Sequence, residues 1–297
     1  MDYRKGIQMD LLNAGVLADK LHMRGILDAL GIVELSKRIY YKEQMKVSAD
    51  FYDKKKDDIS VILNNFADEY SREVYKKCID YRCHFLKKDR PPYGPGEQYF
   101  DEYIISALNH TNKKQVFVDC GAFIGDTIDV FKKYVHDDYE AAVGFEPDST
   151  NADALLENHK DDSRVTCVQT GVWSHETFLN FVSGEGGSSR IIESDEKDNN
   201  SNVVSVKVRA IDDVDECKNA TFIKMDIEGS EMKALEGAKK VIRGNRPILA
   251  ICIYHSDNDM IDIPLWIIDH CQNYNFYCRH YSVNIIETVF YAIPKEY

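Results

Sequence analysis

The chain has 297 residues, of which 44% are hydrophobic and 29% charged, and its formal net charge is −13. This length accommodates one large domain, or one domain with a smaller companion. The negative balance argues against nucleic acid or an anionic membrane surface as the main partner, because like charges repel.

No targeting or membrane-spanning segment is visible in the sequence. The N-terminus lacks the apolar core of a signal peptide, and the apolar run at 248–254 is far too short to cross a bilayer. Eight cysteines are scattered without a CxxC pair and without the spacing of a zinc finger. We therefore expect a cytoplasmic protein with reduced cysteines that pack as small hydrophobic side chains.

The first 92 residues have a helical pattern. Apolar side chains recur at helix-like intervals in 17–35, 59–66 and 74–82. The segment RPPYGPGEQYF, with three prolines and two glycines, marks a boundary. We predict a helical region at 1–92 that packs as a cap on a second domain at 93–297. Closure over a substrate and formation of a homodimer interface are two hypotheses for its role.

After about residue 100, short apolar runs alternate with amphipathic helical patterns. The runs are VFVDCG, AAVGFEP, VTCVQTGVW, FIKMDI and ILAICIY, and SEMKALEGAKKVI reads as one helix. Such alternation predicts a parallel sheet covered by helices on both faces. Residues 203–211 alternate apolar and polar side chains, which predicts a strand that pairs with 177–182. FYCRHY and ETVFYAI predict a closing strand pair.

The run VFVDCGAFIGDT combines a strand, a turn and a helix start. The strand ends in Asp119, and the turn contains Gly121 and Gly125. Glycines at such a junction allow a ligand to approach the backbone. The G-x-x-x-G spacing is a poor dinucleotide fingerprint, and the anionic Asp119 favours a ligand with an ammonium and a sulfonium over a pyrophosphate. The alternative is a turn aspartate followed by helix-capping residues.

The run AAVGFEPDS is a second strand that ends in an acid, Glu146. Ligands of open α/β sheets lie over the carboxyl ends of the strands, where a carboxylate can accept hydrogen bonds from both hydroxyls of a ribose. The alternative is a solvated acid before a helix capped by Ser149 or Thr150.

DCGAFIGDT, GFEPDS and FIKMDIEGSEMKALEGA, in this order and at these separations, resemble the FkbM family of S-adenosylmethionine-dependent methyltransferases. The resemblance covers about residues 98–294. It implies the class I methyltransferase fold, an α/β Rossmann-like arrangement with a seven-stranded mixed sheet, six strands parallel and one antiparallel, and helices on both faces. It also implies S-adenosyl-L-methionine as the cofactor.

The resemblance assigns parts of the cofactor to individual positions. The methionine part would lie against Asp119, Gly121, Phe123 and Gly125, with Asp126 and Thr127 at the helix start. The ribose would be held by Glu146, the adenine edge by Pro147, and the rest of the adenine by Gln169, Gly171, Val172 and Trp173. Which of these last four reads the adenine amine is left open, and Trp173 either stacks on the base or packs as a core indole.

The reaction side falls in KMDIEGSE and in the next strand, ICIYH. Asp226 ends its strand, and Asp226 and Glu228 are predicted to accept the substrate hydroxyl or its proton, whereas Glu231 either shares this work or steadies the helix start. Relatives often carry a glutamate before the histidine of ICIYH; its absence here raises His255 as the base. Asp226, Glu228, His255 and Asp257 could together hold Mg²⁺, but no metal requirement is predicted.

The acceptor contacts are expected in the polar loop after 177–182, with Ser188, Ser189 and Arg190 as candidates. Arg190 suits a phosphate or carboxylate on the acceptor; the alternative is a flexible hairpin loop. The family acts on hydroxyls of sugars and polyketide-like metabolites, so the resemblance predicts O-methylation of a sugar, glycan or secondary metabolite. The alternatives are a nicotinamide-dependent oxidoreductase and a non-catalytic binding module with a methyltransferase fold.

Overall fold

The computed structural model describes residues 32–111, 114–183, 189–192 and 203–297. Contacts divide the chain into two units, Met1–Gly94 with Cys278–Thr288, and Pro95–Tyr277 with Val289–Tyr297. No helix in these described ranges is long and apolar enough to span a membrane. All eight cysteines are free.

The first unit is mostly helical where the structure describes it. Its helices are α3 (Ile32–Tyr40), α4 (Lys42–Lys54), α5 (Lys56–Asn65), α6 (Glu69–His84) and the 3-10 helix η1 (Lys87–Asp89). Helix α6 begins at Asp68, whose side chain accepts a hydrogen bond from the Ser71 amide. It ends at Phe85, which has the left-handed conformation common at helix C-termini. Arg279 pairs with Asp68 at 2.8 Å, so the returning segment of this unit is tied to the start of α6.

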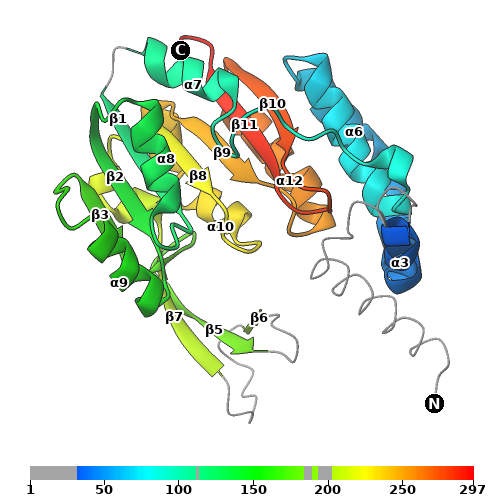
Figure 1. The fold of residues 1–297 in the computed structure, drawn as a ribbon, viewed down its shortest axis with the longest axis horizontal. Coiled ribbons are helices and arrows are strands. Elements are labelled where there is room, and N and C mark those ends of the chain that lie inside the picture. Colours follow the sequence, from blue (N-terminus) through cyan, green and yellow to red (C-terminus); the bar gives the residue numbers. More distant parts are fainter. Residues whose placement is uncertain (1–31, 112–113, 184–188, 193–202) are drawn as a thin grey trace. The chain divides into compact units, whose positions relative to one another are not determined.

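The second unit is organised around a seven-stranded sheet (Figure 1). Its strands, in spatial order, are β10 (Tyr274–His280), β11 (Thr288–Pro294), β9 (Ile248–Cys252), β8 (Phe222–Met225), β1 (Gln115–Cys120), β2 (Tyr139–Phe145) and β3 (Val165–Val168). The pairs β9–β8, β8–β1, β1–β2 and β2–β3 are parallel, and β11 is antiparallel to β9. The predicted closing strand pair is confirmed, because β10 and β11 are neighbours.

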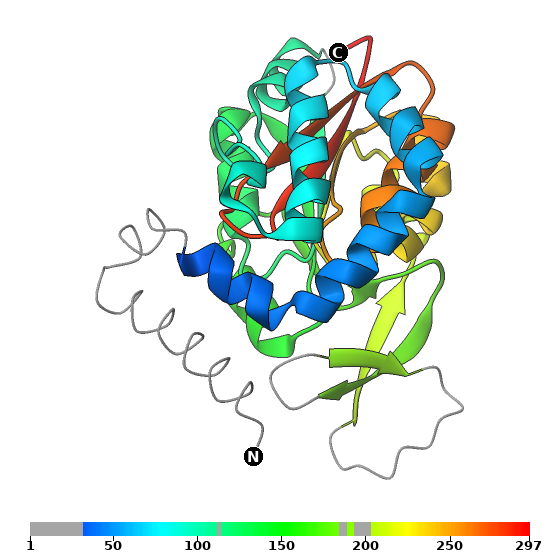
Figure 2. The same ribbon diagram turned by 90° about the vertical axis from the view of Figure 1, so that its right-hand side faces the viewer.

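Helices cover both faces of this sheet. They are α7 (Glu102–His110), α8 (Asp126–Tyr134), α9 (Ser149–Asn158), α10 (Glu231–Glu236), α11 (Lys239–Asn245) and α12 (Asp257–His270), with the 3-10 helices η2 (Ile211–Asp213) and η3 (Asp215–Cys217). Figure 2 shows the teal and green helices on one side of the strands and the yellow and orange helices on the other. Because both faces are covered, β1, β8 and β9 are buried along their whole length.

A second, four-stranded sheet projects from the same unit (Figure 1). Its order is β4 (Gly171–Val172), β7 (Val203–Arg209), β5 (Thr177–Ser183) and β6 (Ser189–Ile192). The predicted pairing of 177–182 with 203–211 is confirmed as the antiparallel β5–β7 pair.

Two predicted elements are each divided in the structure. The run VTCVQTGVW is not one strand, since β3 lies in the large sheet and β4 pairs with β7 in the small one. The predicted helix over 230–242 breaks at Gly237, where an added Cβ would lie 2.1 Å from the Trp173 carbonyl oxygen. Asp212 then caps α11, because its carboxylate accepts from the Lys240 and Val241 amides.

Candidate active site

The carboxyl ends of β1, β2 and β8 meet at one edge of the large sheet, and a cavity of 460 Å³ opens there. Six of the predicted cofactor residues line this cavity, namely Gly121, Phe123, Glu146, Pro147, Gly171 and Val172. Asp226 and Glu228 line it too. Asp119, Gly125, Asp126, Thr127, Gln169, Trp173 and His255 are not among its lining residues. The arrangement follows from parallel pairing, which brings strand ends from distant parts of the chain together.

The turn after β1 is packed tightly against the end of β8. Gly121 has a φ of +81°, and a Cβ there would lie 2.1 Å from the Asp226 carbonyl oxygen. The amides of Gly121 and Ala122 both donate to the Phe145 carbonyl at 3.0 Å. Glycine is therefore required at 121, both by its backbone conformation and by the space available.

The far side of the same turn is held by the end of α9. Asn158 donates from Nδ2 to the Ile124 carbonyl at 2.9 Å, and His159 Nε2 lies 3.2 Å from the Gly125 carbonyl. A Cβ on Gly125 would lie 2.4 Å from His159 Nε2. Asn158 and His159 thus fix the turn that faces the cavity, and neither residue was predicted from the sequence.

Glu146, the acid after β2, is almost fully buried at the cavity wall, with 7% of its surface exposed. Its Oε2 accepts from the Phe123 amide at 3.0 Å and its Oε1 from the Asp148 amide at 2.9 Å. Each carboxylate oxygen has more than one acceptor position, so both retain capacity for a ligand hydroxyl. The two amides hold the carboxylate in place for such a ligand.

The small sheet supplies an apolar wall to the cavity. Val172 of β4, Leu179 of β5, and Val206 and Val208 of β7 line it. Together with Pro147 they offer an apolar surface suited to a flat heterocyclic ring. Ser188 lies outside the described residues. Ser189 and Arg190 lie in β6, where the structure describes only their backbone.

Behind the cavity, Asp119 forms a buried ion pair with Lys224. Lys224 Nζ lies 2.9 Å from Asp119 Oδ1, and it also donates to the Gly121 carbonyl at 2.9 Å. Burial raises the pKa of Asp119 to about 6, although Lys224 acts in the opposite direction. Burial acts to lower the pKa of Lys224, but Asp119 raises it above the ordinary value. Asp119 therefore holds Lys224 in place, and Lys224 in turn holds the backbone of the turn after β1 at Gly121.

Asp226 is held at the edge of the cavity by two hydrogen bonds and one ion pair. Tyr99 donates to Oδ2 at 2.7 Å, Tyr254 donates to Oδ1 at 3.0 Å, and His255 Nε2 lies 3.4 Å from Oδ1. Burial acts to raise the pKa of Asp226, but His255, Tyr99 and Lys224 together lower it below the usual range. Asp226 is accordingly a carboxylate at neutral pH.

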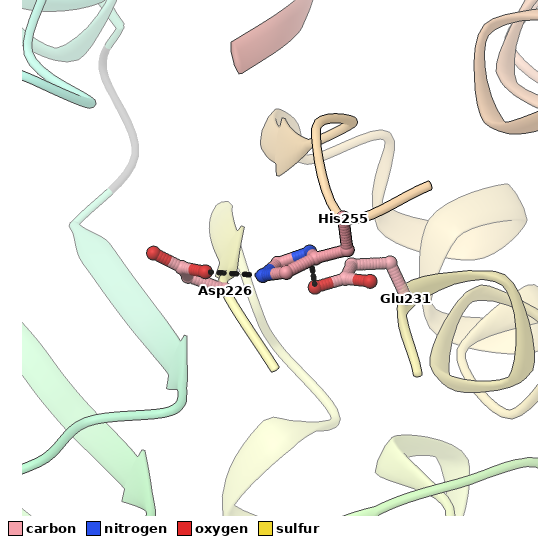
Figure 3. Close-up of side chains that lie close together, drawn as sticks. All are labelled: Asp226, Glu231 and His255. Carbon is pink, nitrogen blue, oxygen red and sulfur yellow. Dashed lines mark ion pairs between the residues drawn. The ribbon is translucent and has the colours of Figure 1, made fainter. Parts of the chain in front are cut away.

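His255 lies between two carboxylates, as Figure 3 shows. Its Nε2 faces Asp226, and its Nδ1 lies 3.2 Å from Glu231 Oε1. Burial acts to lower the pKa of His255, but the two carboxylates raise it to about 10. The ring is therefore an imidazolium at neutral pH.

Among the described residues, Asp226, Glu231 and His255 are the group whose potential metal-ligand atoms lie within 4.8 Å of one another. The two carboxylates face opposite nitrogens of the ring (Figure 3). A metal ion bound to Nε2 would lie beside Asp226, and Glu231 would then face the opposite nitrogen of the ring. A metal ion bound to Nδ1 would lie beside Glu231, and Asp226 would then face the opposite nitrogen. Glu228 has a left-handed φ of 55° and a 94% exposed side chain, whose Oε2 lies 3.7 Å from His255 Nε2. Asp226, His255 and Glu231 thus form a chain of ion pairs.

Tyr99 and Tyr254 were not predicted from the sequence, and the role of Glu231 was open. Tyr99 lies 127 residues before the aspartate that it contacts, so no local spacing marks it. Its φ of 68° is unusual for tyrosine, and its amide donates to the Tyr291 hydroxyl at 3.1 Å. Such a strained backbone is a signal of function that appears only in the structure.

The strand order, the glycine turn after β1 and the acids after β2 and β8 define a class I methyltransferase fold, as predicted. The chain matches the family model described as the methyltransferase FkbM domain over residues 119–276, more than half of its length. It belongs to the FkbM methyltransferase family, which confirms the resemblance found in the sequence.

Several solved structures are similar to this chain, and the first of them supports the fold. The methyltransferase FkbM from Methylobacillus flagellatus KT is 24% identical, with a TM-score of 0.65, and the match covers 80% of this chain and 59% of that chain. An rRNA methylase from Streptococcus thermophilus is 10% identical, with a TM-score of 0.39, over 66% of this chain and 97% of that one. TrmK from M. capricolum, solved with S-adenosyl-homocysteine, is 10% identical, with a TM-score of 0.38. That match covers 65% of this chain and 67% of that chain. No curated protein matches the chain.

Proposed function

We propose that this protein is an S-adenosylmethionine-dependent methyltransferase that methylates a hydroxyl oxygen. The observation that carries the proposal is the presence of two fixed carboxylates on one cavity. Glu146 follows β2 and retains acceptor capacity for hydroxyl groups, and the anionic Asp226 follows β8. One carboxylate suits the ribose of the cofactor, and the other suits the acceptor hydroxyl.

The residues of the cavity fit the cofactor. Gly121 allows the backbone to come close to a ligand, and Glu146 can accept from two ribose hydroxyls. Val172 and Val208 with Pro147 suit an adenine ring. When bound, S-adenosylmethionine supplies an electrophilic methyl group on a positively charged sulfur, and the negative charge of Asp226 favours a cation in this cavity.

Asp226 is the group we assign to the acceptor hydroxyl. As a carboxylate with a lowered pKa it is a weak base, but it can accept a hydrogen bond and orient the oxygen. The hydroxyl proton becomes strongly acidic once its oxygen forms a new bond to carbon, so even a weak base can receive it. His255, as an imidazolium, has no free lone pair for this step, which favours Asp226 over His255 as the proton acceptor.

The acceptor that we propose is a hydroxyl of a sugar, a glycan or a secondary metabolite. This rests on membership of the FkbM family and on the polar segment that contains Ser188, Ser189 and Arg190. A cytoplasmic location and a homodimer through residues 1–92 stay predictions.

Calorimetry with S-adenosylmethionine, S-adenosylhomocysteine and NAD tests the proposal. We expect both sulfur compounds to bind to the wild type, and Glu146→Ala to lose at least tenfold in affinity, since two ribose hydrogen bonds are removed. Binding of NAD without S-adenosylhomocysteine would overturn the proposal in favour of an oxidoreductase. A folded protein that binds none of the three would indicate a non-catalytic module. Transfer of a labelled methyl group to a panel of sugars and nucleotide sugars then identifies the acceptor.

A further inference from the structure

We propose that Glu231 is a positioning residue of the active site, which acts on Asp226 through His255. This inference rests on the proposed function. Of these three residues only Asp226 lines the cavity, whereas Glu231 is fully buried behind it. The side chains form a line from the start of α10 to the cavity wall (Figure 3).

His255 is the contact of Glu231 that explains why a charged side chain is present at this buried position. The Oε1 of Glu231 accepts from the Ile227 amide at 2.8 Å, and no described residue donates a hydrogen bond to its Oε2. An uncharged glutamine would satisfy the Ile227 amide equally well. A carboxylate without a countercharge is costly at a fully buried position, so the cation that compensates it is the imidazolium 3.2 Å away.

The ring of His255 transmits this charge to Asp226. A carboxylate accepts hydrogen bonds and does not donate them, so both ring nitrogens must carry protons to face Glu231 and Asp226 favourably. A neutral ring would turn a lone pair toward one of the two carboxylates. Glu231 therefore keeps His255 charged, and the charged ring holds Asp226 on the side opposite Tyr99.

Other acidic groups around His255 also favour the charged form of its ring, but more weakly than Glu231 does. Glu228 of the turn after β8 reaches to 3.7 Å from Nε2, with a side chain that is 94% exposed and therefore screened by water. Asp259 of α12 interacts electrostatically with both His255 and Glu231. The Tyr254 ring packs against the His255 ring in a tilted arrangement, with the ring centroids 4.1 Å apart. Glu231 is the fully buried carboxylate of this set.

The Glu231→Gln variant tests the inference, because it retains the acceptor for Ile227 and removes the charge. Without that charge the pKa of His255 falls, so the ring loses its proton as the pH rises from neutral to alkaline. We expect NMR of the ligand-free protein to show this lower pKa directly. We expect kcat for methyl transfer to fall roughly tenfold at alkaline pH, and to stay near the wild-type value at mildly acid pH. Affinity for S-adenosylhomocysteine should change less than twofold.

Glu236→Gln is the matched control. It removes a carboxylate from a half-exposed position of the same helix, where Glu236 pairs with Lys233, and neither the pKa of His255 nor kcat should change. In a His255→Gln background, the Glu231→Gln change should have no further effect on kcat, because Glu231 acts only through the ring. If Glu231→Gln does not fold, Glu231→Asp keeps the charge and should retain the high pKa of His255.

Three results would overturn the inference. The first is an unchanged pKa of His255 in Glu231→Gln. The second is an equal loss of kcat in the His255→Gln background. The third is tight Mn²⁺ binding to the wild type that broadens the His255 signals and is lost in Glu231→Gln, since the cluster would then be a metal site. Failure of the wild type to bind S-adenosylhomocysteine would instead contradict the proposed function, and the NMR measurement would still decide the role of Glu231.

Discussion

Lys224 Nζ lies 2.9 Å from Asp119 Oδ1, and neither side chain is more than 3% exposed. Removal of one partner leaves an uncompensated buried charge, so we expect Lys224→Met to lower the free energy of unfolding by about 3–5 kcal/mol. Urea unfolding measures this loss. The double variant Asp119→Leu with Lys224→Met should recover much of it, since no buried charge remains. A double variant less stable than Lys224→Met would show that the ion pair is not the cause.

Asp226→Asn should strongly slow methyl transfer while the cofactor still binds. The amide cannot receive a proton, and we expect kcat to fall roughly 100-fold to 10,000-fold. The glycine turn and Glu146 are unaltered, so the affinity for S-adenosylhomocysteine should stay within a few-fold of the wild type. Asp262→Asn, on the exposed face of α12, is the control and should retain full activity. An active Asp226→Asn enzyme would contradict the assignment of Asp226.

Gly121→Ala and Gly244→Ala should change stability in opposite directions. At 121 the new Cβ would lie 2.1 Å from the Asp226 carbonyl in a backbone with positive φ, so we expect a loss of stability and of cofactor binding. At 244, within α11, no atom outside the glycine's own stretch of helix lies within 4 Å of the new Cβ. Alanine should there raise the free energy of unfolding by about 0.5–1 kcal/mol. Thermal unfolding and calorimetry with S-adenosylhomocysteine distinguish the two effects.

Asn158→Ala should weaken cofactor binding, although Asn158 does not line the cavity. It removes the hydrogen bond to the Ile124 carbonyl that holds the turn after β1, and we expect a decrease in affinity of about threefold to tenfold. Asn245→Ala is a close match, because Asn245 also donates from a helix end to a loop carbonyl, that of Lys218. The two variants should lose similar stability, and only the first should lose affinity. Equal affinities would refute the role of Asn158.

Much of the fold was predictable because its strands are continuous apolar runs that end in glycine or acid. The order of Asp119, Glu146 and Asp226 along the chain identified three strand ends, and parallel pairing brings such ends to one edge. The divided elements were not predictable. The break at Gly237 depends on the close approach of the Trp173 carbonyl, which is a tertiary contact.

The candidate site was predictable only where local sequence determines it. Asp226 follows its strand directly, so its place at the edge of the sheet could be inferred. Tyr99 reaches Asp226 from a distant turn, and Glu231 has an ordinary local explanation as an acid at a helix start. Only the fold places His255 between Glu231 and Asp226 and gives the buried glutamate a partner.

One wall of the cavity comes from the small sheet, through Leu179 of β5 and Val206 and Val208 of β7. The carboxylates come from the ends of the large sheet. A substitution at one of these three apolar positions therefore reshapes the cavity without altering the strands that carry Glu146 and Asp226. The apolar wall of the cavity and its carboxylates are therefore carried by different sheets. Substitution libraries restricted to β5 and β7 should alter substrate selectivity and leave the carboxylates in place.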